Sequence, residues 1–365
     1  MEPRLTVVIP IYNRSREVER LMQTLLSQDM DDAEFLFIDD GSTDDTAKRI
    51  RFFLPKDSRL RLITKQNSGT GDTRNQGIRA SRGKWLFFLD SDDAIPFPTT
   101  LSKLVDIAES EHVQIAGGST QFEKRGTVIP SFMGWPEPDS SVLDSRLSDI
   151  GDLTQEPFEY FIENGVFPYA DYQYDAGFSR FIYLKELLTD HDIKFPCTTF
   201  YEDPLFFVRA MDAAQYFAAV PEPTYTYRLG WHPVRCDYKF CQETLLGFKS
   251  NLVFSKERGY SRLHRITYER FRKFNAVELA LTSDTYSSLK QLVQSTYEAF
   301  DPHFVGADIT SEEPASISAI NRFGTPEWNS AKARFKRFRR LETLKIKNAV
   351  KCNPLFLKLE ELGIH

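Results

Sequence analysis

The sequence predicts an α/β fold in which a mostly parallel sheet is flanked by helices. In the first 120 residues, short β-branched or aromatic runs alternate with longer polar stretches whose apolar residues have helical spacing. Strands that alternate with helices of about 10–15 residues form βαβ units with parallel strands. The hydrophobic fraction of 41% is ordinary for a globular chain, which excludes disordered and fibrous classes.

Five strands and four helices are predicted in this part of the chain. The strands are 5–11, 34–38, 60–64, 84–89 and 113–116. The helices are 14–27, 43–53, 71–81 and 99–110. The first helix shows the periodicity most clearly, because Val18, Leu21, Met22, Leu25 and Leu26 fall on one face.

After Gly117 the alternation is weaker, and the expected elements are mixed. They are a hairpin at 119–130, loops at 134–151 and 168–177, renewed helix from 155, a helix at 201–213, and strands at 216–220 and 224–229. Only helices are expected over 242–300. The 365 residues exceed one typical domain of about 100–200 residues.

Net charge and cysteine content exclude several classes of protein. The formal charge is −6, which argues against nucleic acid as a partner. The four cysteines are scattered without a Cys-x-x-Cys pair, so neither a disulfide framework nor a zinc ribbon is indicated. No signal peptide is visible, and the longest apolar runs fall short of the ~20 residues that span a bilayer. We therefore expect a cytoplasmic protein.

One segment near the C-terminus departs from this charge balance. Residues 332–351 contain nine basic residues against Glu342 alone, with aromatic and leucine residues interleaved at near-helical spacing. Such a basic amphipathic helix is typical of attachment to an anionic membrane. We expect 329–351 to lie either on the inner face of the cell membrane or, as an ordinary surface helix, on the protein itself.

Polar and acidic residues follow the predicted strands. The four stretches are Pro10–Arg14, Asp39–Asp44, Asn67–Gly77 and Asp90–Asp93. Ligands of open α/β sheets bind outside the carboxyl ends of strands, and carboxylates gathered there need a cation or a donor-rich ligand to offset their repulsion. Asp90 and Asp92, two residues apart after an apolar strand, suit a hard divalent cation with oxygen ligands.

Two other nucleotide-binding classes lack their sequence signals. Neither a Walker lysine nor a Gly-x-Gly-x-x-Gly turn follows the first strand. A nucleotidyltransferase on a similar sheet would need a glycine- and lysine-rich loop where Tyr12-Asn-Arg14 stands. That class and a non-catalytic nucleotide- or glycan-binding module remain the alternatives.

Six motifs in order, over residues 5–235, resemble the family 2 glycosyltransferases of the inverting GT-A type. They are Val7–Asn13, Ile38–Asp44, Asn67–Gly77, Phe88–Asp93, Phe195-Pro196 with Tyr201-Glu202-Asp203, and Tyr225–Arg228. The resemblance implies a Rossmann-like mixed sheet with a helical C-terminal appendage. It divides the chain into a GT-A domain over 1–235, with a donor half 1–118 and an acceptor half 119–235, and a helical region over 236–365.

The same resemblance assigns roles to individual residues. The nucleotide sugar, expected to be UDP-linked, is assigned to Pro10, Tyr12, Asp39, Arg74, Asp90 and Ser91. Asp92 is assigned to Mn²⁺ or Mg²⁺, with His232 either a second ligand or a structural histidine. Asp203 is assigned as general base, and Glu202 as its supporting residue.

The expected reaction is sugar transfer to a glycan or glycolipid acceptor in surface polysaccharide synthesis or a related pathway. Trp135 and the loop Tyr169–Tyr174 are candidates for contact with an acceptor sugar, since aromatic faces pack on sugar C–H surfaces. Ordinary loop packing is the alternative for both.

Overall fold

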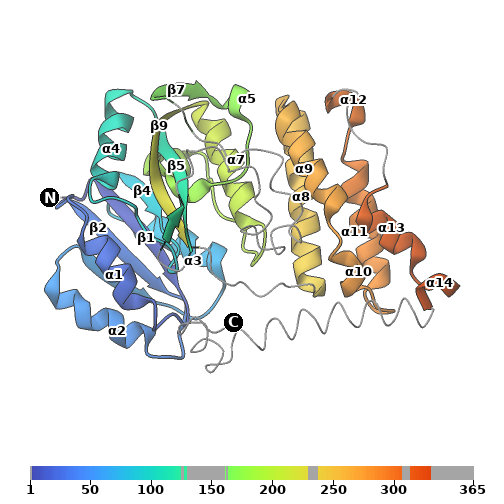
Figure 1. Ribbon diagram of the computed structural model, residues 1–365, viewed down its shortest axis with the longest axis horizontal. Coiled ribbons are helices and arrows are strands. Elements are labelled where there is room, and N and C mark those ends of the chain that lie inside the picture. The colour runs from blue at the N-terminus through green and yellow to red at the C-terminus, as the bar shows by residue number, and fades with distance from the viewer. Residues whose placement is uncertain are drawn as a thin grey trace. The chain divides into compact units, whose positions relative to one another are not determined.

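The computed structural model describes residues 2–124, 127–129, 161, 163–228, 237–305 and 313–329. The chain divides into two compact units, Met1–Leu229 and Gly230–His365. We call the first the sheet unit and the second the helical unit, and describe each by itself (Figure 1).

Among its described residues, the sheet unit has one mixed sheet of nine strands, flanked by helices as predicted (Figure 1). Eight strands follow in the order β3-β2-β1-β4-β8-β5-β9-β7, and β6 pairs with β5 beside this path. Their bounds are β1 Leu5–Ile11, β2 Ala33–Asp39, β3 Leu60–Thr64, β4 Trp85–Phe88, β5 Ile115–Lys124, β6 Thr127–Ile129, β7 Gly165–Pro168, β8 Phe181–Leu184 and β9 Tyr216–Arg228.

Helices of the sheet unit connect these strands. They are α1 Val18–Leu26, α2 Thr46–Phe53, α3 Thr70–Ala80, α4 Thr100–Ser110, α5 Tyr169–Tyr172, α6 Lys185–Asp190 and α7 Glu202–Ala214, with short 3₁₀ turns at Leu54–Lys56 and Phe178–Arg180. Strands β1 to β4 pair in parallel, as do β5 and β9, whereas β8 runs antiparallel to β4 and β5. The four predicted helices of the donor half correspond to α1 to α4.

The side chains of β1 point alternately to the two faces of the sheet and show which helices cover each face. Leu5, Val7 and Ile9 belong to a buried cluster that includes side chains of α1 and α4. Val8 points the other way, toward α3, where a Cβ added to Gly77 would lie 2.2 Å from Val8 Cγ1. Successive side chains of a strand face opposite sides, so β1 is buried on both faces. The apolar character of all its residues except Thr6 follows from this burial.

The acceptor half differs from the prediction in its strands. The two strands expected at 216–220 and 224–229 are one strand, β9, which continues through Pro221 and Pro223. Its pairing with β5 changes register around Ser119, opposite these prolines. Proline cannot donate a ladder hydrogen bond and is tolerated at such irregularities. Strand β5 is likewise longer than predicted, and β6 pairs back on its end as the expected hairpin does.

Four short elements were not predicted. Strands β7 and β8 have four residues each, and α5 and α6 have four and six. Segments of this length show too little periodicity to be distinguished from loops. Helix α5 therefore falls inside a predicted loop. The loop expected at 134–151 and the start of the helix expected from 155 lie outside the described residues, whereas 165–168, at the end of that expected helix, is strand β7.

The helical unit has no strand among its described residues, in agreement with the prediction. Its helices are α8 Tyr238–Arg258, α9 Ser261–Lys273, α10 Val277–Ala280, α11 Tyr286–Glu298, α12 Pro302–Val305, α13 Ala315–Arg322 and α14 Pro326–Asn329. Leu245 and Leu252 of α8, Leu263 of α9, and Leu289 and Val293 of α11 are fully buried. Within the described ranges, no helix combines the length and apolar character that spanning a membrane requires.

Candidate active site

Asp39 ends β2 with one carboxylate oxygen satisfied and the other unpaired. The residue is 1% exposed, and its Oδ1 accepts a hydrogen bond from the N–H of Ser42 at 3.0 Å. Its Oδ2 is buried without a hydrogen-bond partner. An unsatisfied buried acceptor costs about 1–3 kcal/mol. A ligand that offers an N–H here would remove that penalty.

Tyr12 and Pro10 belong to the neighbouring strand end. Pro10 is buried in β1 opposite Ile38, and the next pair along joins Ile11 to Asp39. Tyr12 follows directly and is 45% exposed. The large aromatic side chain and the unpaired carboxylate oxygen thus come from adjacent strand ends.

Asn13 ties these two strand ends together. It has a left-handed backbone with φ of 51°, a conformation that asparagine adopts more readily than most residues. Its N–H donates to Ser42 Oγ at 3.0 Å, and its Oδ1 accepts from the N–H of Thr43 at 2.8 Å. The loops after β1 and β2 therefore hold each other in place.

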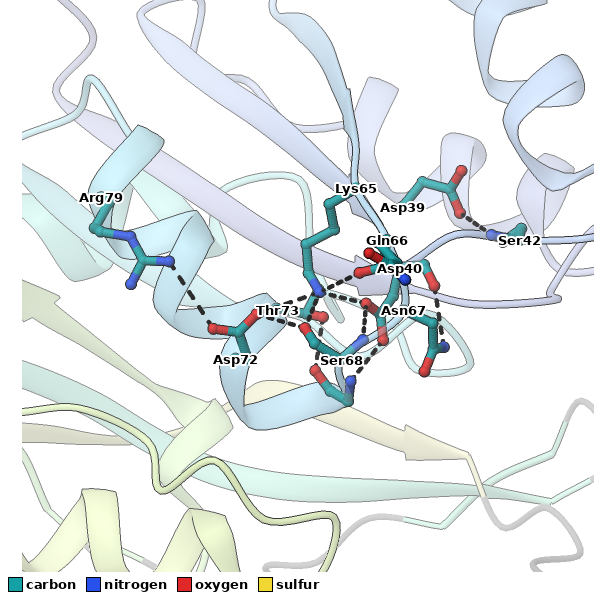
Figure 2. Close-up of polar contacts among 11 residues, drawn as sticks. Asp39, Asp40, Ser42, Lys65, Gln66, Asn67, Ser68, Asp72, Thr73 and Arg79 are labelled. Carbon is teal, nitrogen blue, oxygen red and sulfur yellow. Dashed lines mark hydrogen bonds and ion pairs between the residues drawn. The ribbon is translucent and has the colours of Figure 1, made fainter.

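Asp40, next to Asp39, has a fully engaged carboxylate (Figure 2). Its Oδ1 accepts from the N–H of Ser68 at 2.9 Å and its Oδ2 from the N–H of Gly69 at 2.9 Å. Lys65 Nζ bonds to Asp40 Oδ1 and lies 3.3 Å from Asp72 Oδ2. Because Ser68 and Gly69 precede α3, Asp40 satisfies backbone donors at the start of that helix.

Helix α3 is packed closely against the segment that precedes α7. A Cβ added to Gly71 would lie 2.2 Å from the carbonyl oxygen of Pro196. Asn75 donates from Nδ2 to the carbonyl of Phe195 at 2.8 Å and accepts from the N–H of Phe195 at 2.9 Å. These contacts join the donor half to the residues just before α7.

Arg74 of α3 bridges two carboxylates from distant parts of the sheet unit. Its Nη2 donates to Asp90 Oδ1 at 2.7 Å, and its Nη1 donates to Glu202 Oε1 at 2.9 Å. The guanidinium carbon lies 4.8 Å from the ring centre of Phe178. Burial by itself lowers the pKa of Arg74, but Asp90 and Glu202 outweigh it and raise that pKa above its usual value.

The turn after β4 contains two accessible and two buried polar side chains. The side chains of Asp90 and Asp92 are about one third exposed, whereas Ser91 and Asp93 are buried. Arg14 Nη2 lies 3.6 Å from Asp92 Oδ2. The pKa of Asp93 is raised to about 8, first by burial and then by the nearby charge of Asp90.

Glu202 and Asp203 begin α7 directly after Tyr201. Tyr201 adopts a left-handed backbone with φ of 61°, which turns the chain into the helix. A helix N-terminus stabilises negative charge. Burial nevertheless raises the pKa of Glu202 above its usual value, although Arg74 opposes this. Burial and the adjacent Glu202 raise the pKa of Asp203 to about 7.

The predicted residues thus form two groups, and Arg74 holds the second of them together. Pro10, Tyr12 and Asp39 lie at one pair of strand ends, whereas Arg74 contacts both Asp90, in the turn with Ser91 and Asp92, and Glu202, beside Asp203. His232 and Trp135 lie outside the described residues, as does 332–351. Tyr169 and Tyr172 are buried, which favours the packing interpretation for that part of the loop.

Sequence reasoning did not assign individual roles to several residues at these strand ends. Asp40 and Asp93 were part of quoted acidic runs, and Tyr225, Tyr227 and Arg228 were part of a quoted motif. Tyr227 is 36% exposed, and burial together with Asp93, Asp92 and Asp90 raises its pKa to about 12. The repeated acidic residues indicated that some of them stabilise the fold, but the partners of Asp40 and Asp93 lie at least 25 positions away in the sequence.

The carboxylates of the β4 turn could supply some, but not all, of the ligands of a hard cation. Asp92 offers accessible carboxylate oxygen, the donor type that Mg²⁺ and Mn²⁺ take. In the part of the chain that the structure describes, no group of three or more His, Cys, Asp or Glu side chains is placed to hold a metal. A cation here would therefore need further ligands from water and phosphate, which is usual for Mg²⁺.

Comparison with known proteins finds a family match over part of the chain. Residues 6–151 match the sequence model described as "Glycosyl transferase family 2". The chain is 25% identical over 277 residues to "Putative glycosyltransferase EpsH" of Bacillus subtilis, with 74% of each chain covered. It is 27% identical to "Uncharacterized glycosyltransferase EpsJ" of the same organism, over 62% of each chain.

Two further similarities are more limited in extent or identity. The "GalNAc(5)-diNAcBac-PP-undecaprenol beta-1,3-glucosyltransferase" of Campylobacter jejuni is 30% identical over 134 residues, which is 36% of this chain and 43% of that one. The crystal structure of S. aureus TarS 1-349 in complex with UDP-GlcNAc matches with a TM-score of 0.59 at 20% identity, covering 82% of each chain. The latter similarity concerns the fold.

The mixed sheet with acidic residues at its strand ends is the GT-A fold. The chain is a glycosyltransferase, and its residues 6–151 belong to glycosyl transferase family 2. The predicted fold class and family are both confirmed.

Proposed function

We propose that this chain is a metal-dependent, inverting glycosyltransferase that moves a sugar from a nucleotide-sugar donor to a hydroxyl of a glycan or glycolipid. The observation that carries the proposal is the Arg74 bridge, since it connects Asp90 of the β4 turn to Glu202 beside Asp203. Residues 1–118 bind the donor in this proposal, and 119–235 bind the acceptor. Residues 236–365 are an appended helical region.

The donor base belongs at Asp39 and Tyr12. The uracil base of a uridine nucleotide has one ring N–H, which suits the unpaired Oδ2 of Asp39, and a flat face on which an exposed tyrosine can stack. Asp90 then contacts the ribose, with Ser91 and Pro10 at the same sheet edge. The TarS structure of similar fold contains UDP-GlcNAc, so that compound is the first donor to test.

Asp203 is the proposed general base. Its carboxylate takes the proton of the acceptor hydroxyl while that oxygen forms a bond to the anomeric carbon. The bond from the anomeric carbon to the phosphate oxygen breaks, and the nucleoside diphosphate leaves with the electron pair. A single displacement inverts the anomeric centre. A base acts best when its pKa lies near the working pH, and that of Asp203 is about 7.

Asp92 is the proposed metal ligand, with Mn²⁺ or Mg²⁺ as the ion and His232 as a second ligand to be tested by substitution. When bound, the cation stabilises the negative charge that develops on the departing diphosphate. Arg14 already lies near Asp92 and contributes positive charge at the same place. Asp203 and Asp92 therefore have separate tasks, one at the acceptor hydroxyl and one at the leaving group.

The proposal is tested first by a donor screen and then by substitution of the base. Nucleotide sugars with Mn²⁺ should raise the thermal unfolding temperature, because ligands that bind the native state stabilise it. With the donor found, Asp203→Asn should lower kcat by about 10²–10⁴-fold. Asp212→Asn, another acidic residue of α7, is the control and should keep the wild-type rate. Near-normal transfer by Asp203→Asn would contradict the assignment of the base.

We also propose that 329–351 binds an anionic membrane surface, where a glycolipid acceptor would be met. The support is its sequence, in which basic residues far outnumber acidic ones. Flotation with vesicles that contain anionic lipid tests this in the full chain. Replacing Arg334, Arg337, Arg339 and Arg340 by Gln should abolish flotation, and equal flotation of both proteins would contradict the proposal.

A further inference from the structure

The end of β9 contacts the turn that follows β4. Ala94 and Thr226 form an antiparallel bridge, with the Ala94 N–H donating to the Thr226 carbonyl at 3.1 Å and the Thr226 N–H donating back at 2.9 Å. The turn 90–93 ends just before this bridge. Tyr225 and Arg228 of β9 both contact the turn 90–93 with their side chains.

Tyr225 connects the first and last residues of the turn. Its hydroxyl accepts a hydrogen bond from the N–H of Asp90 at 3.3 Å and donates to Asp93 Oδ2 at 2.6 Å. Tyr225 and Asp93 are only 1% and 3% exposed. A buried carboxylate needs such donors, and these contacts fix the distance between the two ends of the turn.

Arg228 holds the same turn from its backbone and its side chain. Its N–H donates to Asp93 Oδ1 at 2.8 Å, and its Nη1 donates to the Asp93 carbonyl at 3.1 Å. The carbonyl of Asp92 lies 3.5 Å from the same nitrogen. Nε donates to Glu123 Oε2 at 3.1 Å, which anchors the guanidinium to β5. The backbone on both sides of the Asp92 side chain is therefore restrained.

We propose that Tyr225 and Arg228 are positioning residues that hold the turn 90–93 in the conformation in which Asp92 binds the divalent cation. The inference rests on the proposed function, since it takes Asp92 as the metal ligand. Tyr225 contacts the backbone of Asp90 and the side chain of Asp93, so the carboxylates of Asp90 and Asp92 stay accessible to a ligand. Substitution of groups that orient metal ligands in this way typically lowers metal affinity by about 10- to 100-fold.

The test removes one hydroxyl and compares the loss with that of a matched hydroxyl elsewhere. Tyr225→Phe removes the link between Asp90 and Asp93 but keeps the ring. Tyr183→Phe is the control, because Tyr183 is also fully buried and its hydroxyl donates to the Phe178 carbonyl at the same distance of 2.6 Å. Binding of UDP is measured by calorimetry at increasing Mn²⁺, and thermal unfolding is recorded for both variants.

We expect the two variants to lose similar stability but to differ in metal dependence. Tyr225→Phe should raise the Mn²⁺ concentration for half-maximal UDP binding by about 10- to 100-fold, whereas Tyr183→Phe should leave it unchanged. Arg228→Lys keeps the charge but not the forked geometry, and it should also raise the Mn²⁺ concentration for half-maximal UDP binding. This variant provides the test if Tyr225→Phe does not fold.

Three outcomes distinguish this inference from the proposed function. An equal Mn²⁺ requirement in Tyr225→Phe and Tyr183→Phe, with Mn²⁺-dependent binding in the wild type, overturns the inference alone. The same holds if Arg228→Lys and Tyr225→Phe both match the wild type. UDP binding by the wild type that is independent of Mn²⁺ overturns both the inference and the metal role in the proposed function.

Discussion

The ends of β2 and β4 both present neighbouring aspartates, but they hold them by different means. At the end of β2, Asp40 is bound by Lys65 and by two backbone N–H groups before α3, while Asp39 keeps an unpaired oxygen. At the end of β4, Asp93 is bound by the Tyr225 hydroxyl and the Arg228 N–H. In each run, one carboxylate maintains the local structure and a neighbour is left for a ligand.

The difference lies in the charge that offsets each structural carboxylate. Asp40 is paired with a buried cation, whereas Asp93 receives hydrogen bonds from a neutral hydroxyl and a backbone N–H and has a pKa raised to about 8. A buried ion pair is destabilised strongly when one partner is removed. The β2 end should therefore respond to substitution mainly in stability, and the β4 end mainly in the geometry of its turn.

Removing the carboxylate of Asp40 should have the largest effect on stability. Asp40→Ala leaves two backbone donors without their partner and Lys65 with Asp72 as its remaining carboxylate, so we expect the free energy of unfolding to fall by about 3–5 kcal/mol. Asp39→Ala, which loses one hydrogen bond, should cost only about 1 kcal/mol. Urea denaturation of both variants measures the difference. Equal losses would show that the two aspartates do not divide structural and binding roles.

For nucleotide binding, substitution of Asp39 should have a larger effect than substitution of Asp40. Asp39→Asn presents either an amide oxygen or an N–H to the base, so UDP binding should weaken by about 1.5–3 kcal/mol, the range of a hydrogen bond to a charged group. Calorimetric titration with UDP checks this. Asp31→Asn, at an exposed acidic residue before β2, is the control and should leave the affinity unchanged. Unchanged affinity in Asp39→Asn would remove this residue from the base site.

At the β4 end, Asp92→Asn should separate metal binding from stability. The side chain is about one third exposed, so the free energy of unfolding should stay within about 0.5 kcal/mol of the wild type. The Mn²⁺ requirement of UDP binding should rise at least about tenfold, which is 1.4 kcal/mol. Metal titrations monitored by UDP binding give the comparison. Wild-type behaviour would exclude Asp92 as a ligand.

The smallest predicted effect concerns pH. The base must be deprotonated to act, so kcat/KM should rise with pH through about 7, the raised pKa of Asp203. Glu202 contributes to raising that pKa, so Glu202→Gln should move the acidic limb to lower pH. Glu186→Gln, at an acidic residue of α6 instead, should not. A limb that stays in place in Glu202→Gln would contradict the interaction between the two carboxylates.

The sequence predicted the elements that carry long regular patterns and missed those set by tertiary contacts. Strand β1 was recognisable because all seven residues are buried and apolar or β-branched except for its proline. Strand β9 was split in two because Pro221 and Pro223 normally end strands, whereas here a register change in β5 accommodates them. Strand β8 has only four residues, and its pairing with two distant strands defines it.

The candidate site shows the same division. Motif order was enough to identify Asp39, Asp90, Asp92 and Asp203 as candidates. It gave Asp40 no structural role, because the partners of Asp40 arrive from the loop after β3. Nor did it indicate that Tyr225 contacts the β4 turn, 135 positions before it. Whether an aspartate in an acidic run stabilises the fold or binds a ligand depends on whether its carboxylate has partners within the protein.

The stereochemistry of donor hydrolysis tests the proposed reaction most directly, because water can replace an unknown acceptor. With the α-linked nucleotide sugar that stabilises the protein most in the presence of Mn²⁺, proton NMR shows which anomer of the free sugar appears first. The proposed mechanism predicts the β-anomer first, and loss of this reaction in Asp203→Asn. The α-anomer appearing first, or an unchanged rate in Asp203→Asn, would contradict a single displacement with Asp203 as its base.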